Sequence, residues 1–139
     1  ISSEGVAIDM PAGPSEVLVI ADQSPHADFV AADLLSQAEH GPDSQVVLIC
    51  THSEMPGKVL AAVDKQLKNL SRSHIAGSAL ENSLAVVVKS PQDAIDFSNL
   101  YAPEHLILAC DQPEWYAERV TNAGSVFLGH YTPESAGDY

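Results

Sequence analysis

Five short apolar runs, separated by longer amphipathic segments, constrain the fold of this chain more than any other feature of its sequence. Each run consists of consecutive apolar residues rather than apolar and polar residues in alternation. That pattern is typical of strands that are buried on both faces of a parallel sheet. The expected strands span residues 17–21, 45–50, 84–88, 106–109 and 125–128.

The segments between these runs carry apolar residues at helical spacing, and three of them begin at a helix-start signal. Ser24 and Ser90 are each followed by proline, so each serine is expected to cap a helix whose first residue is that proline. Ser53 is the expected cap of the helix between them. The apolar pattern places helices from 25 to about 40, after 53 with apolar positions up to 70, after 90 with apolar positions 94, 95 and 100, and from 111 to about 122.

Strands that alternate with helices predict a three-layer, Rossmann-like α/β sandwich built on a mainly parallel five-stranded sheet. The pattern leaves the strand order open, and it leaves open whether the fifth strand is parallel or antiparallel. A length of 139 residues corresponds to one domain, residues 1–139. The chain begins at Ile1 without methionine and stops at Tyr139 with no terminating helix or strand, so we expect a piece of a longer, multidomain protein.

Charge and cysteine content exclude several classes of function. Nineteen acidic residues against six basic ones give a formal net charge of −13, which repels nucleic acid and anionic membrane surfaces. No apolar run approaches the ~20 residues of a membrane-spanning helix. Cys50 and Cys110 each end an apolar run and form no C-x-x-C motif, which favours buried thiols in a reducing, cytoplasmic compartment.

The glycine-rich motifs of the common nucleotide-binding sites are absent. No G-x-G-x-x-G follows a predicted strand, and no G-x-x-x-x-G-K-[ST] occurs. A dinucleotide site of the usual kind is therefore not contained in this segment, and cofactor-binding residues remain unknown.

Gln37 and His40 are the first candidate metal ligands. They lie three residues apart at the end of the first expected helix, so they share one face of its last turn. Gln37 can offer its amide oxygen and His40 an imidazole nitrogen. Taken alone, the pair is better explained by His40 capping the last helix carbonyls while Gln37 is solvated.

The other polar candidates fall at the same end of the sheet. In a parallel sheet, helix ends and strand starts lie along one edge. Ligands of open α/β sheets usually bind at the opposite edge, so this clustering departs from the rule. The residues that map to the amino-terminal edge of the strands are Ser15, Gln37, His40, Glu104 and His105.

Glu104 and His105 are adjacent, and neighbouring residues of a strand point to opposite faces. They can serve one site only if they sit in the loop before the strand, and Pro103 favours an extended or turn conformation there. An exposed glutamate beside a half-buried histidine without a catalytic role is the alternative. Asp138 follows Leu128 by ten residues, which can span up to ~33 Å and return to this edge.

Taken together, these residues lie in motifs that resemble histidinol dehydrogenase, a zinc enzyme of histidine biosynthesis. The motifs follow the order of the family and cover essentially the whole chain. They are residues 8–17 (IDMPAGPSEV), 33–41 (DLLSQAEHG), 99–106 (NLYAPEHL), 124–129 (GSVFLG) and 132–139 (TPESAGDY).

The resemblance implies a role for each candidate. Gln37, His40 and Asp138 match zinc ligands, which also places them against the substrate. Ser15 matches a substrate-binding serine. His105 matches the general base and a substrate contact, and Glu104 matches the carboxylate that activates water for the second oxidation. The implied reaction is oxidation of L-histidinol to L-histidine through an aldehyde-level intermediate, with Zn²⁺ and two NAD⁺.

The resemblance also implies what the chain lacks. The family's fourth zinc ligand, a histidine, and a further substrate-binding carboxylate come from the partner subunit of a homodimer, and most NAD contacts precede Ile1. We therefore expect the isolated chain to be inactive. Two alternatives remain open: a related dehydrogenase that acts on another small polar alcohol, and a non-catalytic binding module.

Overall fold

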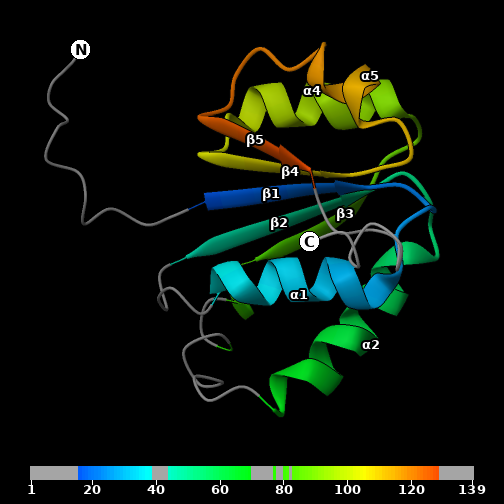
Figure 1. Ribbon diagram of the computed structural model, residues 1–139, viewed down its shortest axis with the longest axis vertical. Coiled ribbons are helices and arrows are strands. Elements are labelled where there is room, and N and C mark those ends of the chain that lie inside the picture. Colours follow the sequence, from blue (N-terminus) through cyan, green and yellow to red (C-terminus); the bar gives the residue numbers. More distant parts are fainter. Residues whose placement is uncertain (1–15, 39–43, 70–76, 78–79, 82, 129–139) are drawn as a thin grey trace, which may run out of the picture.

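The computed structural model describes residues 16–38, 44–69, 77, 80–81 and 83–128 (Figure 1). Its strands form a single sheet in the order β3-β2-β1-β4-β5, and every neighbouring pair is parallel. The open question about the fifth strand is thereby resolved, because β5 pairs with β4 in parallel. The strands are β1 (Glu16–Ala21), β2 (Gln45–Cys50), β3 (Leu84–Val87), β4 (His105–Ala109) and β5 (Ser125–Leu128).

Helices cover both faces of this sheet, which confirms the predicted three-layer α/β class (Figure 1). α1 (Ala27–Ala38) and α2 (Met55–Leu67) lie on one face, and α4 (Pro91–Tyr101) and α5 (Pro113–Ala117) lie on the other. The chain progresses outward from β1 through β2 to β3, and then returns to the other side of β1 to form β4 and β5. The strand order therefore reverses between β1 and β4.

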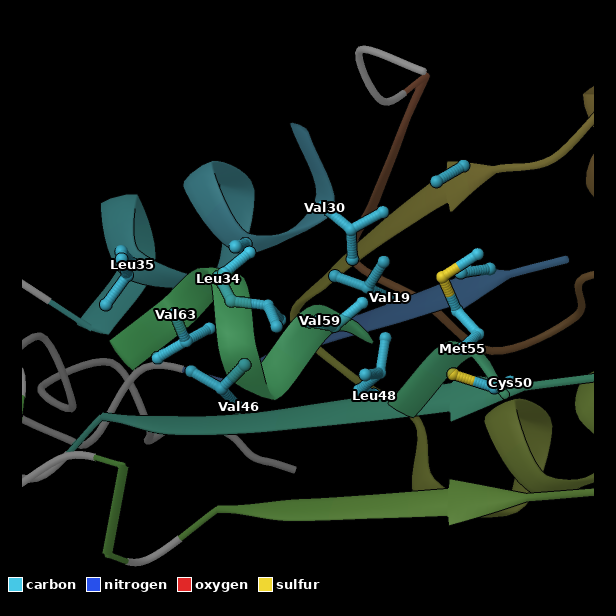
Figure 2. Packing of buried hydrophobic residues seen from close by; sticks show 14 of the residues in the cluster. Val19, Val30, Leu34, Leu35, Val46, Leu48, Cys50, Met55, Val59 and Val63 are labelled. Carbon is cyan, nitrogen blue, oxygen red and sulfur yellow. The ribbon is translucent and has the colours of Figure 1, made fainter. Parts of the chain in front are cut away.

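The core consists of two apolar layers, one on each face of the sheet. Alternate residues of the central strands supply each layer, because successive side chains of a strand point to opposite faces. Figure 2 shows the layer under α1 and α2, where Val30, Leu34 and Val59 pack over Val19 and Leu48. Burial of side chains of this size stabilises the fold by about 1.5–3 kcal/mol each.

One of the three predicted helix caps is confirmed and two are wrong. The Ser90 side chain accepts a hydrogen bond of 3.2 Å from the Asp93 amide at the start of α4. Ser24 does not cap α1, which starts only at Ala27, and its hydroxyl donates to Asp22. Ser53 does not cap α2, since that helix starts at Met55 without a side-chain cap.

The last helix is much shorter than the apolar pattern predicts. α5 ends at Ala117, and the expected extension to Asn122 is wrong. The reason is a competing set of hydrogen bonds: the Asn99 side-chain oxygen accepts from the backbone amides of Thr121 (2.9 Å) and Asn122 (3.3 Å). Those amides are consequently unavailable for helical bonding, and the chain turns toward β5.

The outer strands are less buried than their apolar sequences suggest. β1 and β2 are buried along almost their whole length, as predicted for strands covered on both faces. By contrast, Leu84 of β3 and Phe127 of β5 are 52% and 50% exposed, because these strands form the edges of the sheet. Leu100 is 88% exposed despite its place in the apolar pattern of α4. No helix among the described residues is long and apolar enough to cross a membrane.

Candidate active site at the amino-terminal edge of the sheet

The strand register brings the start of β4 beside the start of β1. Val17 pairs with His105, and Glu16 pairs with Gln45 of β2 on the other side. Ser15 immediately precedes β1 but lies outside the described residues. The prediction that the first and fourth strands begin at one edge is confirmed, although Val17 and His105 are 88 residues apart in the sequence.

α1 ends at the same edge from which β1 and β4 begin (Figure 1). The helix runs back across the sheet, so its last turn lies toward the strand starts. Gln37 occupies that turn and is half-buried. His40 and Asp138 lie outside the described residues, so of the three candidate metal ligands only Gln37 is placed.

His105 is the first residue of β4, one residue earlier than the sequence predicts. Its strand neighbours Leu106 and Leu108 belong to the layer under α4 and α5, whereas Ile107 packs against the layer under α1 and α2. By alternation His105 therefore faces the α1 side. Its ring lies against Phe127, with the ring centroids 5.7 Å apart and the planes at 47°.

The Nδ1 atom of His105 is buried and has no hydrogen-bond partner among the residues that the structure describes. Buried polar atoms are almost always hydrogen-bonded, so such an atom calls for a partner from elsewhere. His105 lies at the edge that Gln37 also approaches. An unsatisfied imidazole nitrogen here is able to accept or donate a proton.

Glu104 lies in the bend that precedes β4 and is exposed. The expected loop position is thus confirmed for Glu104 and wrong for His105, which is already part of β4, so only Glu104 is free of the strand's alternation of faces. The bend follows α4 through Ala102, which adopts the left-handed conformation (φ 55°, ψ 61°) and donates a 2.8 Å hydrogen bond to the Ser98 carbonyl. A left-handed residue that is not glycine costs about 1–2 kcal/mol, so the surroundings of this turn must hold it in place.

Tyr101 and Gln45 add a contact at this edge that the sequence did not reveal. The Tyr101 hydroxyl donates a hydrogen bond to the side-chain oxygen of Gln45, which joins the end of α4 to the start of β2. Burial, and secondarily the nearby Glu16 carboxylate, raise the pKa of Tyr101 above its ordinary value. The hydroxyl consequently stays protonated and keeps donating. The only sequence signal was the position of Tyr101 three residues before Glu104.

The opposite edge, where ligands of such sheets usually bind, is organised differently. A cavity of about 390 Å³ lies there beside Asp22, Asp111 and Trp115. Both carboxylate oxygens of Asp22 are engaged, one by the backbone amide (2.8 Å) and hydroxyl of Ser24 and the other by the Asp111 amide (2.9 Å). Asp22 therefore ties the end of β1 to the end of β4.

No group of three or more His, Cys, Asp or Glu side chains that could hold a metal occurs within the described part of the chain. Both cysteines are free and fully buried, as predicted. Burial raises the pKa of each thiol to about 12. They are therefore neutral thiols rather than metal-binding thiolates.

Comparison with known proteins identifies a family for this chain. The family model described as histidinol dehydrogenase matches residues 1–139. The chain is 58% identical to histidinol dehydrogenase of Vibrio vulnificus over 135 residues, which is 97% of this chain and 31% of that protein. It is 57% identical to histidinol dehydrogenase of Bacteroides thetaiotaomicron over 139 residues, or 100% of this chain and 32% of that protein.

A solved structure agrees with these sequences. The crystal structure of histidinol dehydrogenase from Elizabethkingia anophelis superposes with a TM-score of 0.84 at 58% sequence identity. The match covers 94% of this chain and 30% of that chain. The chain thus spans about a third of the length of the relatives that it matches.

Proposed function

Because the chain belongs to the histidinol dehydrogenase family, we propose that it forms one α/β domain of a longer enzyme that oxidises L-histidinol to L-histidine. The observation that supports the proposal is that the end of α1, which carries Gln37, and the start of β4, which carries His105 just after Glu104, lie at the amino-terminal edge of the sheet. That edge is unusual for ligand binding in an α/β fold. The isolated domain is proposed to be inactive.

The proposed metal is zinc, with Gln37, His40 and Asp138 as its ligands in this chain. An amide oxygen, an imidazole nitrogen and a carboxylate oxygen form a donor set that zinc accepts. The position of Gln37 in the last turn of α1 supports this proposal, because α1 ends at the edge from which β4 starts. When bound, zinc supplies a positive charge that holds the substrate's amine and imidazole and polarises the reacting alcohol.

His105 and Glu104 carry the proton transfers in this proposal, and Ser15 helps to bind the substrate. In the first half-reaction the His105 imidazole takes the hydroxyl proton while a hydride passes from carbon to NAD⁺, giving an aldehyde and NADH. In the second, Glu104 takes a proton from water as it adds to the aldehyde carbon, and the His105 imidazolium returns its proton to the aldehyde oxygen, which gives the hydrate. The hydrate then loses a hydride to a second NAD⁺ and a proton to His105, giving the carboxylic acid.

The proposed enzyme is a cytoplasmic homodimer whose partner subunit completes the zinc shell with a histidine. Three ligands from this chain would leave zinc room for a further protein ligand and for the substrate. The NAD-binding residues are proposed to lie in the remaining two thirds of the longer polypeptide, consistent with the absence of a glycine-rich nucleotide motif here.

The test is a stoichiometry measurement on the full-length protein. With zinc, NAD⁺ and L-histidinol it should form two NADH for each L-histidine produced. An amino alcohol without the imidazole ring is the matched control, and it should react far more slowly. Faster oxidation of that control would favour a dehydrogenase of another small polar alcohol. Absence of any NADH with either alcohol would favour a binding module.

A further inference from the structure

The bend that carries Glu104 is held by the start of β5. The Gly124 amide donates to the Pro103 carbonyl (3.1 Å), and the Ser125 amide donates to the Glu104 carbonyl (2.9 Å). These two bonds bracket Glu104 from the neighbouring strand. The two donors lie about 20 residues further along the chain, so the position of Glu104 depends on where the backbone of Gly124 and Ser125 lies.

Gly124 allows this approach because it has no side chain. A Cβ atom on Gly124 would stand 2.6 Å from the carbonyl oxygen of Glu104, 3.4 Å from its carbonyl carbon and 3.5 Å from its Cα. All three atoms belong to the backbone, so no flexible side chain can move aside. Gly124 is itself exposed, so the added methyl group would fill no cavity and disturb no core contact.

Asn99 holds the loop that leads to Gly124 by hydrogen bonds. Its side-chain nitrogen donates to the Arg119 carbonyl (3.1 Å), and its side-chain oxygen accepts from the amides of Thr121 and Asn122. The Asn122 side chain in turn donates to the Asn99 carbonyl (3.0 Å). The loop between α5 and β5 is thereby fixed against α4, directly upstream of Gly124.

We propose that Gly124 is a positioning residue for Glu104 and His105, with Asn99 holding the loop that presents it. The inference rests on the proposed function, in which Glu104 activates water and His105 accepts protons. Neither Gly124 nor Asn99 touches the reacting groups. They act through the carbonyls of Pro103 and Glu104, which set where the Glu104 carboxylate stands and where β4 begins.

The test compares Gly124→Ala with Gly57→Ala in the full-length enzyme. Gly57 lies exposed in α2, and a Cβ there meets nothing within 4 Å, so it controls for adding a methyl group. NADH formation is started either from the amino alcohol or from the amino aldehyde. A displacement near 1 Å can cost about 10²-fold in rate, so Gly124→Ala should lower kcat for the aldehyde by about that factor. KM should stay nearly constant, and the loss from the alcohol should be smaller.

A merely structural role would give a different result. Loss of folded enzyme would lower both rates by the same factor and leave their ratio at the wild-type value, which would overturn the proposal. Hydrogen exchange of the Ser125 amide reports on its bond to the Glu104 carbonyl and does not require catalysis. It should accelerate in Gly124→Ala and not in Gly57→Ala. Unchanged protection would also overturn the proposal, even if the wild-type enzyme proved inactive toward L-histidinol and the proposed function failed.

Asn99 provides a second pair of variants in case Gly124→Ala folds poorly. Asn99→Ala removes the three bonds that the Asn99 side chain makes with the loop and should change the ratio of the two rates in the same direction as Gly124→Ala. Asn99→Asp keeps an oxygen that accepts from Thr121 and Asn122 and should restore much of the ratio. Equal ratios in Asn99→Ala and the wild-type enzyme would contradict the role given to Asn99.

Discussion

Val17 of β1 and His105 of β4 are partners in the parallel register, so the start of the central strand and the predicted general base lie side by side. Ser15 stands two residues before Val17, and Pro103 two residues before His105. This relationship explains why residues from distant parts of the sequence can serve one site. It also indicates which side chains to change in the full-length enzyme.

Glu104 and His105 should affect the two half-reactions unequally. Loss of a positioned acid–base group typically costs ~10²–10⁴ in rate. Glu104→Gln should slow oxidation of the amino aldehyde by such a factor and the first oxidation of the amino alcohol much less, whereas His105→Asn should slow both. The measurement is the first NADH formed from each substrate. Equal losses for Glu104→Gln would show that this carboxylate has no special part in activating water.

His40→Asn should remove the metal from the full-length enzyme. The substitution takes away the imidazole among the three ligands proposed for this chain, and imidazole is a stronger zinc ligand than an amide. Zinc per subunit, measured by elemental analysis after dialysis, should fall well below one, and turnover should be abolished. His26→Asn is a suitable control because its side chain is 61% exposed and lies at the opposite end of α1. Stoichiometric zinc in His40→Asn would refute the ligand assignment.

The isolated 139-residue chain should bind zinc weakly. It supplies only three of the four proposed ligands, and Asp138 lies one residue from its end, where chain ends tend to fray. Calorimetric titration with zinc should give a dissociation constant well above the nanomolar range. Nanomolar binding by the isolated chain would mean that the shell is complete without the partner subunit.

Cys50 and Cys110 should be unreactive in the folded protein. Burial raises the pKa of each thiol from 9.0 to about 12, so almost none is thiolate at neutral pH. Alkylation followed by peptide mapping should label them only after denaturation. Because folding favours the protonated thiol, their contribution to stability is fully present below pH 9.0 and is lost as the pH rises toward about 12. Rapid labelling of the native protein at neutral pH would contradict this.

The central strands were predictable because hydrophobic burial alone determines them. β2 matches its predicted bounds, since the run from Val46 to Cys50 is apolar and buried throughout. The end of α5 was not predictable, because it depends on hydrogen bonds from Asn99, a residue in another helix. The start of α1 was missed because Ser24 does not cap it: the helix begins at Ala27, and the His26 ring accepts a hydrogen bond from the Asp28 amide (3.2 Å).

The positions of the candidate residues Gln37 and His105 were predictable, but the contacts that hold Glu104 in place were not. A parallel sheet puts helix ends and strand starts on one edge, so the neighbourhood of Gln37 and His105 followed from the element pattern. The role of Gly124 could not be inferred, because a glycine before a strand has many explanations until its neighbour, the Glu104 carbonyl, is known. Ser15, His40 and Asp138 lie outside the described residues. The roles of these three residues, and those of Gln37, Glu104 and His105, stay predictions.

The strand order also determines when each part of the sheet can form while the chain is being synthesised. The Cys110 thiol, just past β4, donates to the Ile20 carbonyl of β1 across a separation of 90 residues. A ribosome adds about 5–20 residues per second, so on the order of ten seconds pass before β4 can join β1. During that interval β2, and after it β3, can add to one side of β1, while the other side of β1 stays open. A nascent chain of this topology therefore exposes one unpaired edge of its central strand until its fourth strand emerges.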